Sequence, residues 1–86
     1  MKEQIIQLKI VYNMNLQRHR QHKYSLLIIC KEQTTFSNRY IAELFEFHIS
    51  AQAETKAFEL LQYNKSFQEF HQKNVYKLEE IGFRFV

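Results

Sequence analysis

The sequence predicts an α+β fold, a single small domain over residues 1–86 in which one or two helices pack on an antiparallel sheet of three to four strands. Apolar residues alternate with polar ones near the N-terminus, as in strands, and recur at helical spacing in the second half. With 86 residues, the chain has room for one core only. Its 45% hydrophobic content is that of a globular domain.

The first two strands are expected to form a hairpin. Alternation over residues 4–14 predicts a strand with one fully apolar face. The run 26–30 is apolar throughout, which predicts that a second strand over 24–31 lies in the middle of the sheet. Residues 15–23 are mostly polar, so they are predicted to be the hairpin loop.

Residues 38–49 fit two structures. As a strand, the segment places Ile41, Phe45 and Phe47 on one face, whereas as a helix it aligns Ile41, Phe45 and His48. The end of the segment is strand-like in composition, and a continuous helix from here to residue 61 would be long for so small a domain. We therefore predict a strand.

Two helices are predicted in the second half. Apolar residues at helical spacing predict a helix over 51–62, which Ser50 is placed to cap. A second helix over 67–81 follows Ser66 and Glu69, whose spacing matches a capping box.

The chain is predicted to end in a short strand. Gly82 suits the left-handed conformation just after a helix, and 83–86 would then form the strand. Residues 74–76 are weak helix formers, so a helix that stops there and a longer final strand is an alternative.

Positive charge is concentrated in the first half of the chain. Residues 1–40 carry seven basic and two acidic side chains, a net +5, whereas residues 41–86 carry five and seven, a net −2. On a hairpin tip, this excess could bind phosphates in a major groove or stack on RNA bases, although a solvated loop is the simpler interpretation. The hypothesis requires the tip to be exposed, unpaired and not helical. The candidate residues for nucleic acid or another anionic partner are Arg18, His19, Arg20, His22 and Lys23.

Aromatic residues provide a second candidate surface. Eight Phe and five Tyr are many for a thin core, although large rings also fill scarce core volume efficiently. An exposed aromatic face would suit a partner protein or a second copy of the chain. The candidates for such a face are Phe47, Phe58, Tyr63 and Phe67.

Catalysis and metal binding have little support in the sequence. His19 and His22 form a His-x-x-His pair, but other soft ligands are scattered and neighbouring arginines would repel a dication. We expect no metal, no cofactor and no catalytic residues. A small metal-free ribonuclease that uses His19 or His22 is a remote alternative, because RNA supplies its own 2′-hydroxyl nucleophile.

These observations predict a non-enzymatic binding or regulatory module in the cytoplasm. Cys30 is the only cysteine, and neither a signal peptide nor a membrane-spanning run is present. The expected partner is nucleic acid or the nucleic-acid-binding surface of a larger protein, with no membrane and no small-molecule substrate. The alternative is an inhibitor or adaptor, of the phage anti-defence or toxin–antitoxin type, that docks on protein through its aromatic face or forms a dimer.

Overall fold

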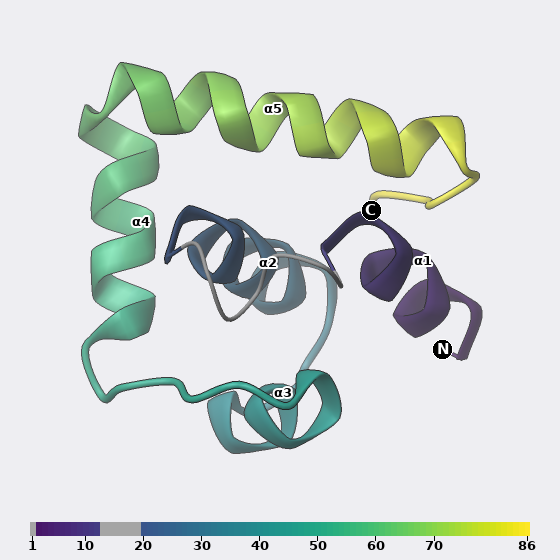
Figure 1. Ribbon diagram of the computed structural model, residues 1–86, viewed down its shortest axis with the longest axis horizontal. Helices are drawn as coiled ribbons and strands as arrows, with labels where there is room; N and C mark the ends of the chain where they lie inside the picture. The colour runs from purple at the N-terminus through teal and green to yellow at the C-terminus, as the bar shows by residue number, and fades with distance from the viewer. Residues whose placement is uncertain (1, 13–19) are drawn as a thin grey trace.

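The computed structural model describes residues 2–12 and 20–86, and these ranges contain five helices and no strand (Figure 1). The α+β prediction is therefore wrong, and the fold is all-α. None of the described helices combines the length and the apolar character needed to cross a lipid bilayer. The helices are α1 (Lys2–Tyr12), α2 (Arg20–Gln33), α3 (Asn38–Phe45), α4 (Ala53–Tyr63) and α5 (Lys65–Glu80).

Helix α2 is the centre of the domain. It packs against each of the other four helices, and in Figure 1 they surround it on all visible sides. All six residues from Ser25 to Cys30 are buried, so the helix is covered around its whole circumference there. Helices α4 and α5 meet at a corner and form two sides of this enclosure (Figure 1).

The predicted strand over 24–31 is instead the middle of α2. An apolar run of this length fits a fully buried strand or a fully buried helix, because neither has a solvent face to impose a period. The predicted central strand is therefore wrong, although the segment is buried as its apolar run indicates.

The other half of the predicted hairpin, the strand over 4–14, is also wrong. This segment contains α1, in which Leu8 and Tyr12 are buried one helical turn apart. Ile6 and Ile10, which completed the alternating pattern, are 58% and 64% exposed. The alternation was therefore produced by two isoleucines that do not contribute to the core.

The predicted strand over 38–49 begins as helix α3. The Ser37 side chain accepts a hydrogen bond from the Tyr40 backbone N–H (3.1 Å) at the helix start, and Ile41 and Phe45 are buried on one face. The helix ends at Glu46, which has a left-handed conformation (φ 56°). The long continuous helix that argued against a helical segment does not form, because the chain turns at this residue.

Helices α4 and α5 lie where helices were predicted over 51–62 and 67–81, but both start signals were misidentified. The N-cap of α4 is Gln52 rather than Ser50. The N-cap of α5 is Asn64, whose side chain accepts from the Phe67 N–H (2.9 Å), and Ser66 lies inside the first turn. Asn64 also ends α4, so a single residue joins the two helices at the corner.

The C-terminal segment folds back on the helices. Helix α5 continues to Glu80, and Gly82 has the predicted positive φ (94°). The predicted strand over 83–86 is wrong, because no neighbouring strand exists in the described chain to pair with it. The turn instead buries Phe83, and the Val86 N–H donates to the Gln33 side-chain oxygen (2.6 Å).

The corner between α4 and α5 gives a direct test of the corrected cap. We expect Asn64→Ala to lower the free energy of unfolding by about 1 kcal/mol, because it removes the acceptor for the first turn of α5. The matched variant Ser66→Ala should change it by less than about 0.5 kcal/mol. Urea unfolding followed by circular dichroism measures both free energies of unfolding. A larger loss for Ser66→Ala than for Asn64→Ala would show that Ser66, and not Asn64, caps α5.

Candidate functional site

A groove of about 340 Å³ lies between the N-terminal half of α2 and the segment that joins α3 to α4. It has cationic, aromatic and aliphatic walls. The described residues that line it are Arg20, Lys23, Tyr24, Leu27, Phe47, His48, Ile49, Ser50 and Ala53.

One wall of the groove is a single face of α2. Arg20, Lys23, Tyr24 and Leu27 are spaced i, i+3, i+4 and i+7, so successive turns of the helix bring them onto the same side. Leu27 reaches into the core, whereas Arg20 at the start of the helix is exposed. The wall therefore runs from an apolar floor to a charged rim.

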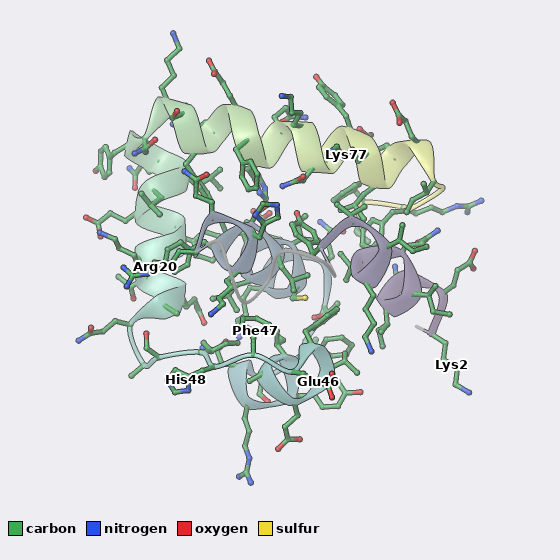
Figure 2. All side chains as sticks on the ribbon, viewed as in Figure 1. Lys2, Arg20, Glu46, Phe47, His48 and Lys77 are labelled. Atoms are coloured by element: carbon green, nitrogen blue, oxygen red, sulfur yellow. The ribbon has the colours of Figure 1, made fainter. Side chains whose placement is uncertain are left out.

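The opposite wall follows from the end of α3. The left-handed residue Glu46 stops the helix, and Phe47 N–H donates to Ala42 O (3.1 Å) as the chain turns. Phe47 then extends toward α2 and is 8% exposed, while His48 extends from the other side of the segment (Figure 2). His48 therefore lies at the rim of the groove, and its ring points away from α2.

The groove is electropositive. Its described lining holds two full cations, Arg20 and Lys23, and no carboxylate. The ion pairs found between described residues involve other lysine and arginine side chains, at Lys31 and Arg39. Lys23 Nζ lies 6.0 Å from the centroid of the Phe47 ring, a cation–π distance that leaves its N–H groups available to a ligand.

The described candidate basic residues lie on two different sides of α2. Arg20 and Lys23 line the groove, whereas His22 lies against the rings of Tyr12 (6.5 Å) and Phe70 (4.8 Å) on the core side of α2. Arg18 and His19 lie outside the described residues. Residues 20–23 form the first turn of α2, so the requirement that this stretch is not helical fails, and the hypothesis of a cationic hairpin tip that enters a major groove is wrong.

The four candidate interface aromatics do not share one exposed face. Phe67 is fully buried and Phe47 is nearly so, which makes both part of the core. Phe58 is partly buried against that core, and only Tyr63, at 76%, is well exposed. Large rings thus fill the core of this small domain, which was the simpler of the two interpretations.

A second groove, of about 420 Å³, lies beside the turn after α5. It is lined by Glu3, Gln4, Gln7, Gly82 and Arg84, and its two charges are of opposite sign. Gln7 Nε2 already donates to the Ile81 carbonyl (3.1 Å). This groove therefore has no net charge, and one of its hydrogen-bond donors is already engaged.

A buried chain of hydrogen bonds joins three helices. Tyr12 Oη in α1 lies 2.8 Å from Ser25 Oγ in α2, which lies 2.7 Å from His71 Nδ1 in α5. When His71 is neutral, the Ser25 hydroxyl can donate its hydrogen to one neighbour and accept a hydrogen bond from the other. Asn74 is buried beside this chain, and its side chain interacts with the Tyr12 hydroxyl, whose pKa is raised by burial. The chain of hydrogen bonds was not predicted, because its members are far apart in sequence and only helix phase brings them together.

The Ser25–His71 pair resembles a nucleophile and its base, but a substrate cannot reach it. Ser25 is fully buried, and neither groove includes it. Cys30 is also buried, and burial raises the pKa of its thiol to about 12, so the thiol is protonated at neutral pH. No group of three metal-ligating side chains occurs within residues 2–12 and 20–86.

Comparisons of the chain with protein-family models, curated proteins and solved structures found no match in any of the three. The functional argument therefore rests on the chemistry of the site.

We expect Ser25→Ala to lower the free energy of unfolding by about 2–6 kcal/mol. The substitution leaves the Tyr12 hydroxyl and His71 Nδ1 buried without partners, at about 1–3 kcal/mol for each group. Tyr12→Phe/Ser25→Ala removes two of the three polar groups and should recover part of the loss. Chemical denaturation measures these differences. A loss below about 0.5 kcal/mol in Ser25→Ala would mean that the chain of hydrogen bonds is not formed.

Stability is also expected to depend on pH through His71. Burial lowers the pKa of its imidazole below the ordinary value of 6.5, so the unfolded chain takes up this proton first as the pH falls. The contribution of neutral His71 to the free energy of unfolding is complete above pH 6.5. It is lost as the pH falls from 6.5 toward the folded-state pKa of His71, by at most about 1.4 kcal/mol per pH unit.

Unfolding measured at pH 7.5, 6.5 and 5.5 should give a shallower pH dependence for His71→Gln than for the wild type. His48→Gln removes an exposed imidazole instead and is the matched control. Identical pH profiles for the wild type and His71→Gln would refute the role of His71.

Proposed function

We propose that this chain is a small cytoplasmic binding module that contacts nucleic acid through phosphate groups held at the groove of Arg20 and Lys23. The observation that carries the proposal is the pair of cations on one face of α2, in a groove whose described lining contains no carboxylate. Such side chains neutralise phosphates and release counterions, which favours binding.

The distribution of charge supports the same partner. The excess of +5 in residues 1–40 lies in the part of the chain that contributes Arg20 and Lys23. Electrostatic attraction to a polyanion extends over about 8–10 Å at physiological ionic strength, so neighbouring cations strengthen the approach of a strand.

An acidic protein surface is the competing partner, and the burial of the candidate aromatic residues argues against it. A stable protein interface usually buries about 800 Å² on each partner, with a central cluster of apolar or aromatic residues. The candidate aromatic residues are mostly buried in the core and do not supply such a cluster. The lone, buried Cys30 is consistent with the proposed reducing compartment.

The test is a salt titration of binding to fluorescently labelled DNA and RNA oligonucleotides. For two neutralised phosphates on a single strand, the logarithm of the association constant should fall with log salt with a slope of about −1.4 from these contacts. The variant Arg20→Gln/Lys23→Gln should bind more weakly at every salt concentration, and its slope should be shallower by about that amount.

The matched control is Lys73→Gln/Lys77→Gln, which removes the same charge from exposed positions on α5 (Figure 2 labels Lys77). It should keep the wild-type slope to within the error of the measurement. Equal losses in the two double variants would show that only net charge matters. No binding by the wild type at 20 mM salt would reject nucleic acid and leave an acidic protein as the partner.

A further inference from the structure

We infer that the groove selects single-stranded nucleic acid and accommodates one nucleotide, with a phosphate at Arg20 and Lys23 and a base against the ring of Tyr24. This inference rests on the proposed function and specifies the class of nucleic acid. It follows from the order of side chains along α2, the size of the groove and the environment of Tyr24.

The order of side chains on α2 matches the parts of a nucleotide. Arg20 lies one helical turn before both Lys23 (i+3) and Tyr24 (i+4), and all three side chains line the groove. Two cations and a ring therefore occupy neighbouring positions on one wall. A phosphate at the cations would leave the attached sugar and base beside the ring.

Tyr24 is suited to stacking. It is partly buried against the core, which restricts its motion, and it lines the groove. In the described part of the chain, its ring makes no aromatic contact and its hydroxyl no hydrogen bond, in contrast to Tyr12. Base stacking on such a ring tolerates every sequence, because each base has a π face.

A duplex cannot use these features together. Its bases are stacked and paired inside the double helix, so a groove of about 340 Å³ can contact the backbone but cannot receive a base. Duplex binding would rely on Arg20 and Lys23 alone. A single strand would gain the ring contact as well, which gives the selectivity.

The experiment compares a 12-nucleotide oligo(dT), a 12-nucleotide oligo(U) and a 12-base-pair DNA duplex by fluorescence anisotropy at 50 mM salt. The wild type should bind both single strands at least tenfold more tightly than the duplex. Tyr24→Leu should weaken single-strand binding about tenfold, the usual size of one base-stacking contact, without changing the salt slope or duplex binding. Tyr24→Phe keeps the ring and should bind as the wild type does.

Tyr63→Leu is the control, since it removes an exposed ring outside the groove and should leave affinity unchanged. Circular dichroism of each variant identifies any that fail to fold. If Tyr24→Leu does not fold, the preference of the wild type and of Tyr24→Phe for single strands over the duplex remains the test. Equal wild-type affinity for duplex and single strands, or full single-strand affinity in a folded Tyr24→Leu, would overturn this inference while the proposed function stands. Failure of the wild type to bind any of the three probes would overturn both.

Discussion

The burial of α2 around its whole circumference is the constraint on which the rest of the structure depends. Six consecutive residues, Ser25 to Cys30, are at most 1% exposed. A helix can lose all contact with water over such a stretch only if other elements cover each of its sides. The remaining four helices do so, and the small buried residues Ala53 and Ala57 allow close packing of α4 on α2. One polar side chain, Ser25, lies within the covered stretch, and its hydrogen bonds to Tyr12 and His71 satisfy it there.

This central position also accounts for the errors of sequence-based prediction. The two helices over 51–62 and 67–81 could be predicted because apolar and polar faces alternate at helical spacing there; α5, for example, buries Phe67, His71, Asn74 and Leu78, while its other face is polar. Helix α2 lacks such a contrast in its apolar run, so its period could not be read. In α1, the exposed residues Ile6 and Ile10 created an alternation stronger than the helical pattern of Leu8 and Tyr12. The fold class was wrong because α1 and α2 do not combine one apolar face with one polar face, and because residues 38–49 and 83–86 were also assigned to strands.

The candidate site shows the same dependence on helix phase. The concentration of charge at Arg20 and Lys23 was visible in the sequence, and both residues line the groove. Tyr24 was missed, since on a strand it lies on the opposite face from Lys23, whereas on a helix residues 20, 23, 24 and 27 share one face. The opposite wall was unpredictable for another reason. It depends on Glu46 adopting a left-handed conformation, which non-glycine residues seldom do.

The two polar regions of α2 have different physical roles because they lie on different sides of the same helix. On the inner side, Ser25 is inaccessible, and burial that lowers the pKa of His71 favours an uncharged hydrogen-bonded link between helices. On the groove side, Arg20 is exposed, Lys23 Nζ lies 6.0 Å from the centroid of the Phe47 ring, and the described lining contains no carboxylate. A charged ligand would lose its solvation without meeting an opposite charge at the first region, whereas the second region holds two cations. Helix α2 therefore links three helices through its buried polar contacts on one side and places Arg20 and the half-buried Lys23 at the groove on the other.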